Sequence, residues 1–231
     1  MVGAAQADIV GVLTRAPSAG GKSRLFAALG RPCDPALLSA LLLDTVDATD
    51  LPHVARIAAV TPADCQDEIR GLLPADVEVI GQGEGDIGLR MRTLMHDLFE
   101  RGARRVVLIG SDLPALSRGH LAEAFTRLAT DPDVLVLGPA TDGGYYLIGA
   151  TRLPPVFEGI DWGTSRVLAQ TRDAARRAGL HVDLLAPLAD VDTVDDLRAA
   201  AAGLAAPRTA QWARSNGIVT SRGSVTSDGV S

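Results

Sequence analysis

The chain has 231 residues, 47% of them hydrophobic, and its formal net charge at pH 7 is −6. This length predicts one domain with a substantial core, and a negative charge without any basic block argues against a nucleic-acid partner. No apolar run approaches the roughly 20 residues of a membrane span, and the N-terminal segment lacks the basic region of a signal peptide, so we expect a cytoplasmic protein with no membrane partner.

Short β-rich runs alternate with helical runs along the chain. The predicted strands are Ile9–Thr14, Val54–Thr61, Val77–Ile80, Arg105–Gly110, Val134–Leu137, Tyr145–Gly149 and Val182–Leu185. The predicted helices are Lys22–Leu29, Pro35–Thr49, Ala63–Leu72, Ile87–Arg101, Ser117–Ala129, Thr164–Gly179 and Thr193–Gly203. Because several strands are apolar throughout, both faces of the sheet should be covered, and we expect an α/β fold, a three-layer α/β/α sandwich with a mostly parallel mixed sheet.

This domain is expected to span residues 1–204, and the remainder, 205–231, is expected to be a mostly disordered tail. The tail is polar, rich in Ser, Thr and Gly, and has no hydrophobic period. Ligands of parallel sheets bind at the carboxyl ends of the strands. The loops that follow Thr14, Ile80, Gly110 and Leu137 should therefore lie along one edge.

The segment APSAGGKSRL, which follows the first predicted strand, contains the only lysine of the chain, Lys22. The segment satisfies a relaxed Walker A pattern, so a P-loop NTPase is one interpretation. Two features oppose it: Ala16 stands where the first glycine belongs, and Gly30-Arg31-Pro32 limits the following helix to barely two turns. A simple turn at the two glycines is a third interpretation, although it gives Lys22 no role.

Five motifs occur in order over Thr14–Leu197, namely TRAPSAGGKSRL, LIGSDLPAL, LGPATDGGYYLIGA, FEGIDWGTSRV and DVDTVDDL. Together they resemble the bacterial GT-A superfamily transferases known as domain of unknown function 2064, which are similar to small nucleotidyltransferases of cofactor synthesis. The resemblance implies a GT-A (nucleotide-diphospho-sugar transferase) fold, a divalent metal, Mg²⁺ or Mn²⁺, and a nucleotide donor. The chain departs from the family pattern at Ser23, Leu89 and Gly163, where Thr, Glu and Ser are usual.

On this resemblance, Gly20, Gly21 and Ser23 bring backbone N–H groups close to the phosphates of a nucleotide. Lys22 and Arg24 would neutralise the triphosphate and favour the departure of pyrophosphate. A helix cap or a surface ion pair is the alternative role for Arg24.

Asp112 lies just past a buried strand, where a carboxylate is well placed to hold Mg²⁺. Asp192, just before a helix, resembles the second metal carboxylate of the family, and two carboxylates from distant loops can clamp one Mg²⁺. Asp190 is a weaker candidate. Asp195 and Asp196 suit the first turn of the following helix, where negative charge is stabilising.

The polar turn TDGGYY is expected to bind the acceptor or a sugar through Asp142, Gly143, Gly144 and Tyr145, with Asp142 also a candidate catalytic group. Trp162 and Thr164 would close over the same site, and Gln82 and Asp86 of the loop GQGEGDIG would bind the nucleotide. A simple turn, ordinary packing of the indole ring and a solvent-exposed loop are the respective alternatives.

The sequence thus favours a Mg²⁺-dependent nucleotidyltransferase that transfers a nucleotide from an NTP to a small phosphorylated or anionic acceptor. The alternative within the same fold is a glycosyltransferase that uses a nucleotide sugar. A P-loop NTPase and a non-catalytic nucleotide-binding protein are further alternatives.

Overall fold

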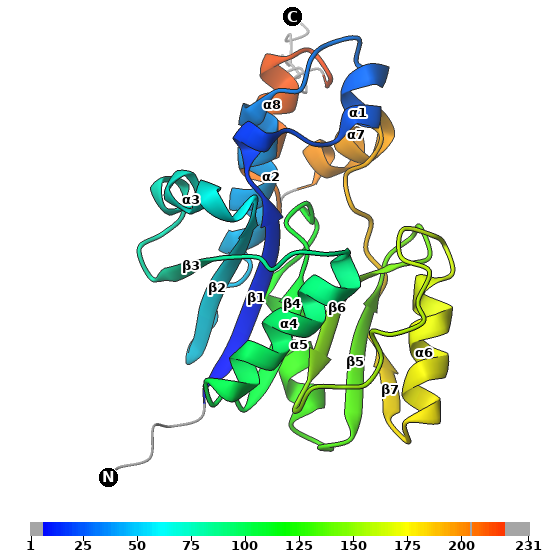
Figure 1. Ribbon diagram of the computed structural model, residues 1–231. Coiled ribbons are helices and arrows are strands. Elements are labelled where there is room, and N and C mark those ends of the chain that lie inside the picture. Colours follow the sequence, from blue (N-terminus) through cyan, green and yellow to red (C-terminus); the bar gives the residue numbers. More distant parts are fainter. Residues whose placement is uncertain (1–6, 204, 220–231) are drawn as a thin grey trace, which may run out of the picture.

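The computed structural model describes residues 7–203 and 205–219. Seven strands form one sheet in the order β3-β2-β1-β4-β6-β5-β7 (Figure 1). The strands are β1 (Asp8–Arg15), β2 (Val54–Thr61), β3 (Val77–Gly81), β4 (Arg105–Ile109), β5 (Val134–Pro139), β6 (Tyr145–Ala150) and β7 (His181–Leu184). Only β6 runs antiparallel to its neighbours β4 and β5 among these strands, so the sheet is mixed and mostly parallel, as predicted.

Helices alternate with these strands, close to the positions that the hydrophobic pattern predicts. They are α1 (Ser23–Ala28), α2 (Pro35–Asp47), α3 (Gln66–Leu72), α4 (Ile87–Glu100), α5 (Arg118–Leu128), α6 (Val167–Arg177), α7 (Val194–Ala202) and α8 (Pro207–Ser215), with 3-10 turns η1 (Pro17–Ala19) and η2 (Ala63–Cys65). None of the helices in the described part of the chain is long and apolar enough to cross a bilayer.

Two hydrophobic cores cover the two faces of the sheet. Along β4, Val107 and Ile109 belong to the core shared with α2, α3 and α5. Val106 and Leu108 belong to the core shared with α4 and α6. Successive side chains of a strand point to opposite faces, so a strand covered on both faces is apolar at most positions. The three-layer α/β/α sandwich is confirmed.

A third core lies outside the sandwich, at the carboxyl-terminal edge of the sheet. It joins α1, α2, α7 and α8 through Leu25, Phe26, Leu37, Leu41, Val191, Leu197, Ala201, Ala210, Trp212 and Ala213. Figure 1 shows α1, α7 and α8 grouped together beyond the ends of the parallel strands. This core therefore supports the loops that surround the carboxyl ends of the strands.

The expectation of a disordered tail is wrong for residues 205–219, whereas 204 and 220–231 lie outside the described residues. Trp212 is only 8% exposed, and its Nε1 donates to Asp34 Oδ2 at 2.7 Å. Asp44, whose side chain is fully buried, accepts from the backbone N–H of Thr209 at 2.8 Å. A nine-residue helix such as α8 has little stability of its own, so its formation depends on contacts that the local composition does not reveal.

We expect Trp212→Ala to lower the free energy of unfolding by about 3–5 kcal/mol, because it removes a large side chain from the third core. Trp212→Phe should cost less, because most of the buried area remains and the bond to Asp34 is the main loss, typically about 1 kcal/mol. Urea unfolding followed by circular dichroism measures both values. An unchanged midpoint for Trp212→Ala would show that α8 does not contribute to the fold.

Candidate functional site

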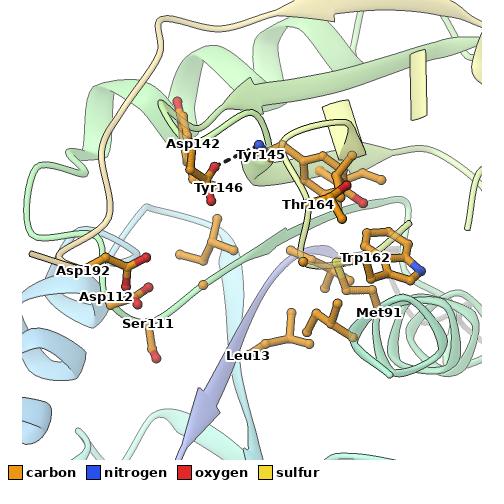
Figure 2. A pocket seen from close by; sticks show the side chains of 18 of the residues that line it. Leu13, Met91, Ser111, Asp112, Asp142, Tyr145, Tyr146, Trp162, Thr164 and Asp192 are labelled. Atoms are coloured by element: carbon orange, nitrogen blue, oxygen red, sulfur yellow. Dashed lines mark hydrogen bonds between the residues drawn. The ribbon is translucent and has the colours of Figure 1, made fainter. Parts of the chain in front are cut away.

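A cavity of about 530 Å³ lies at the carboxyl ends of the central strands (Figure 2). The loop after β4, the start of β6, the segment before α6 and the segment before α7 all reach it. Its lining comprises Leu13, Arg24, Ile87, Met91, Leu108, Ile109, Gly110, Ser111, Asp112, Asp142, Gly144, Tyr145, Tyr146, Ile148, Trp162, Gly163, Thr164, Val167 and Asp192. Of the predicted site residues, Arg24, Asp112, Asp142, Gly144, Tyr145, Trp162, Thr164 and Asp192 are thus brought together.

Beside this cavity, the ammonium group of Lys22 contacts two carboxylates from distant parts of the chain. Its Nζ donates to Asp112 Oδ2 and, at 2.6 Å, to Asp192 Oδ1. The side chain of Lys22 is only 15% exposed. Lys22 occupies the N-cap position of α1 with φ at 49°, a left-handed conformation that is uncommon for residues other than glycine. The ammonium group of Lys22 is therefore positioned by a backbone conformation that has an energetic cost.

The two carboxylates stabilise the charged form of Lys22. Burial of the amine lowers its pKa, but Asp112 and Asp192 outweigh that effect and raise the pKa above its usual value of 10.5. Because the pKa is higher in the folded state, this contribution to stability is complete below about pH 10.5 and is lost as the pH rises through the folded-state pKa.

Hydrogen bonds of the neighbouring backbone hold the segments that carry the two carboxylates. Asp112 follows β4, and its backbone oxygen accepts from the N–H of Val191 at 3.2 Å, which joins the two loops directly. Thr193 and Asp196 form a capping box that begins α7. The predicted structural role of Asp196 is confirmed, and Asp192, one residue before the cap, is left to face Lys22.

The site has an excess of negative charge around Asp190. Burial first, and then the charges of Asp112, Asp142 and Asp192, raise the pKa of Asp190 to about 7, although Lys22 acts in the opposite direction. Within residues 7–203 and 205–219, no group of three or more His, Cys, Asp or Glu side chains is arranged to hold a metal ion. Asp112 and Asp192, the predicted metal ligands, both contact the ammonium group of Lys22.

Asp142 lies at another side of the cavity, in the turn between β5 and β6 (Figure 2). Its Oδ1 accepts from the backbone N–H of Gly144 at 2.8 Å. Gly143 has a φ of 93°, and a Cβ atom there would lie 2.3 Å from the backbone oxygen of Ser165. Only glycine fits this close approach, so the turn that carries Asp142 is packed against the segment before α6.

Two aromatic side chains form part of the cavity wall. The rings of Tyr145 and Trp162 meet edge to face, with centroids 6.3 Å apart. Trp162 packs directly on α4, because a Cβ atom at Gly88 would lie 2.2 Å from its ring.

Tyr146 points to the opposite face of β6, where its hydroxyl donates to the backbone oxygen of Ala186 at 3.1 Å. Burial raises the pKa of Tyr146 to about 12, so the hydroxyl stays protonated.

Gln82 and Asp86, which we expected to bind the nucleotide, do not line this cavity. Gln82 Nε2 donates to the backbone oxygens of Thr14 and Ala59, at 2.9 and 2.8 Å, and ties its loop to β1 and β2. Asp86 caps α4 by accepting from the N–H of Leu89 at 2.8 Å. Both side chains therefore have structural roles here.

The loop that precedes Lys22 depends on two residues that the sequence did not single out. The guanidinium of Arg15 donates to the backbone oxygen of Ala19 at 3.1 and 3.2 Å. Glu68 of α3 accepts from the N–H of Ser18 at 2.9 Å. Gly20, Gly21 and Ser23, which follow this part of the loop in the chain, do not line the cavity. The position of Arg15 inside the motif TRAPSAGGKSRL was a usable signal, whereas Glu68 lay in no motif.

Lys22 should react more slowly with an amine-directed reagent than an exposed amine does, because its protonated form is stabilised and half-buried. Asp192→Asn should accelerate labelling of Lys22, since one of the two partners that raise its pKa is weakened. Mass spectrometry of the labelled peptide measures the rate. Asp195→Asn is the matched control, because Asp195 is exposed and bonds only to Arg198 in the described part of the chain. Equal rates in both variants would contradict the ion pair.

Comparison with known proteins shows similarity in both sequence and structure. The model of the DUF2064 family, described as an uncharacterized protein conserved in bacteria, matches residues 44–164. A provisionally assigned nucleotide-diphospho-sugar transferase from Desulfovibrio desulfuricans G20 is 30% identical, with a TM-score of 0.81 over 92% of this chain and 96% of that protein. No curated protein matches the chain in sequence.

More distant structures share the fold alone. CMP:2-keto-3-deoxy-manno-octonic acid synthetase, solved in complex with CTP, gives a TM-score of 0.55 at 15% identity, over 91% of this chain and all 100% of that one. A 4-diphosphocytidyl-2C-methyl-D-erythritol synthase from Anaerococcus prevotii DSM 20548 gives 0.55 at 12% identity, over 84% and 94% of the two chains. This fold leaves the P-loop interpretation of APSAGGKSRL without support. The chain belongs to the DUF2064 family and has the fold of the nucleotide-diphospho-sugar transferases.

Proposed function

We propose that this protein is a metal-dependent transferase that uses a nucleotide donor, and that the group it transfers is a nucleotidyl group. The observation that carries the proposal is the contact of Lys22 with Asp112 and Asp192 beside the cavity. A donor triphosphate needs a cation for its phosphates and carboxylates for the metal that accompanies it. The contact brings both kinds of group to one point.

Asp112 and Asp192 fit a divalent metal. Their oxygens already converge on a single cationic group, and carboxylate oxygens are the ligands that Mg²⁺ prefers in proteins. A bound ion would neutralise phosphate charge and orient the donor. Because Asp192 is 59% exposed, it can turn toward a ligand without disturbing a core.

Lys22 and Arg24 are the cations available for the leaving group. Arg24 lines the cavity and has no ion pair with the described residues. In nucleotidyl transfer, an oxygen of the acceptor attacks the α-phosphorus, and negative charge builds on the departing pyrophosphate. Cations beside the departing pyrophosphate stabilise that charge more in the transition state than in the ground state.

Glycosyl transfer from a nucleotide sugar is the second candidate. Support comes from the 30% identical protein of Desulfovibrio desulfuricans, which carries a provisional assignment as a nucleotide-diphospho-sugar transferase. In that reaction the same carboxylates would hold the metal at a diphosphate, and Asp142 would hold or deprotonate the acceptor.

The released product distinguishes these reactions. A thermal-shift panel of NTPs and nucleotide sugars, with and without Mg²⁺, first identifies the donor. Turnover with that donor should then release pyrophosphate. Release of nucleoside diphosphate would instead establish glycosyl transfer, and release of orthophosphate would indicate hydrolysis. Binding without any turnover would identify a non-catalytic nucleotide-binding protein.

We expect Asp112→Asn to abolish the Mg²⁺ dependence of nucleotide binding and to leave the fold intact, because the side chain is partly exposed and lies in a loop. The thermal-shift panel measures the binding and circular dichroism the fold. Asp195→Asn should behave like the wild type. Unchanged Mg²⁺ dependence in Asp112→Asn would remove Asp112 from the proposed metal site.

Lys22→Ala should reduce kcat/KM by about 30- to 900-fold, which corresponds to about 2–4 kcal/mol of transition-state stabilisation from one preorganised donor. Lys22→Arg should not restore the rate, since the planar guanidinium cannot reproduce a point contact with two carboxylates. Steady-state kinetics with the identified donor test both variants, and full activity of Lys22→Arg would contradict the point contact.

A further inference from the structure

We propose that Lys22 competes with the divalent metal for Asp112 and Asp192, so that metal binds tightly only together with a nucleotide whose phosphates draw the ammonium group away from these carboxylates. The inference rests on the proposed function, because it concerns how donor and metal enter that same site. It makes the contact of Lys22 with the two carboxylates an autoinhibitory contact.

The ammonium group of Lys22 uses oxygens that a metal ion would need. Its Nζ donates to Asp112 Oδ2 and, at 2.6 Å, to Asp192 Oδ1, and Figure 2 shows the two carboxylates close together. Mg²⁺ binds carboxylate oxygens at about 2.0–2.1 Å, so an ion on both residues would take nearly the place of the ammonium nitrogen. Two positive charges at such a short distance repel each other strongly. The ammonium group and the ion therefore exclude each other.

A metal ion that displaces Lys22 would leave the ammonium group without a partner. Among the described residues, this group makes no other hydrogen bond or ion pair. The side chain of Lys22 is mostly buried, so water cannot fully replace the lost carboxylates, and a charge that is both buried and unpaired is costly. The ion pair therefore opposes metal binding in the absence of nucleotide.

Nucleotide phosphates remove this opposition, because they give the ammonium group a new anionic partner. The backbone of Lys22 is fixed at the N-cap of α1, but the four-carbon stem of a lysine is flexible and lets Nζ move from one anion to another. Arg24, which follows on α1, lines the cavity proposed to hold the phosphates. Asp192 is more than half exposed, so it is free to turn toward the ion. Metal and nucleotide should thus strengthen each other's binding by the same factor.

Lys22→Met tests the competition, because it removes the ammonium group and keeps an unbranched side chain of similar length. Electron paramagnetic resonance of free Mn²⁺ measures the Mn²⁺ affinity of the full chain without nucleotide. We expect Lys22→Met to bind Mn²⁺ about tenfold or more tightly than the wild type, since the two carboxylates are then available to the ion. Equal or weaker affinity in Lys22→Met overturns the inference.

Arg198→Met separates the contact of Lys22 from the overall charge of the protein. It removes one positive charge from α7, the helix that follows Asp192, where Arg198 pairs only with Asp195 in the described part of the chain. Its Mn²⁺ affinity should equal that of the wild type. An increase as large as that of Lys22→Met would mean that any lost cation has the effect, and the competition would be refuted.

The wild-type chain provides a second measurement that does not depend on the folding of a variant. Saturation with Mn²⁺ alone should accelerate labelling of Lys22 by an amine-directed reagent, because the ion takes both of its partners. Addition of the nucleotide that the thermal-shift panel identifies should slow the labelling again, because the phosphates then cover the amine. Labelling that stays slow in saturating Mn²⁺, or stays fast after nucleotide is added, contradicts the inference.

Nucleotide binding distinguishes failure of this inference from failure of the proposed function. Mg²⁺-dependent stabilisation of the wild type by nucleotide reports on the proposed donor site. If nucleotide binds in this way and Lys22→Met gains no affinity for Mn²⁺, the competition is wrong and the proposed function stands. If no nucleotide binds, the proposed function is wrong, and the inference is overturned with it, because nothing then draws the ammonium group away from the carboxylates.

Discussion

The contact of one ammonium group with two carboxylates organises the site of this protein. Lys22 follows the first strand, Asp112 follows the fourth, and Asp192 precedes α7, so three loops that are far apart in the sequence meet at one point. A half-buried charge without a partner is expensive. Each of the three side chains therefore restricts where the other two loops can lie.

The third core holds two of the segments that form the contact of Lys22 with Asp112 and Asp192. Leu25 and Phe26 follow Lys22 on α1, and Val191 lies immediately before Asp192, and all three are buried in that core. Helix α8 completes it with Trp212. The segments that carry Lys22 and Asp192 thus pack on one hydrophobic core, whereas Asp112 lies in the loop that follows β4. Packing in the third core thus restricts the positions of Lys22 and Asp192 beside the cavity.

The cavity combines two different chemical surfaces. One side has the cations and the converging carboxylates, which suit phosphates and a metal ion. The lining also includes Asp142 and the aromatic rings of Tyr145 and Trp162, which meet edge to face. Strand β6 runs antiparallel to its neighbours β4 and β5. It therefore begins at the edge of the sheet where β4 and β5 end. Tyr145, its first residue, is thereby delivered to the cavity.

The sequence by itself determined the strands, the helices up to residue 203, the layers of the sandwich and the loops that carry Lys22, Asp112 and Asp142. These features depend on local patterns, namely apolar strands, capping residues and glycines. Only the tertiary structure decided that Lys22 bonds to both carboxylates, that Gln82 and Asp86 support backbone rather than line the cavity, and that residues 207–215 form a docked helix. The physical reason is that, apart from the cap that Asp86 makes to Leu89, these contacts join residues many positions apart. Periodicity reports which face of an element is buried, but it carries no information about which distant side chain meets that face.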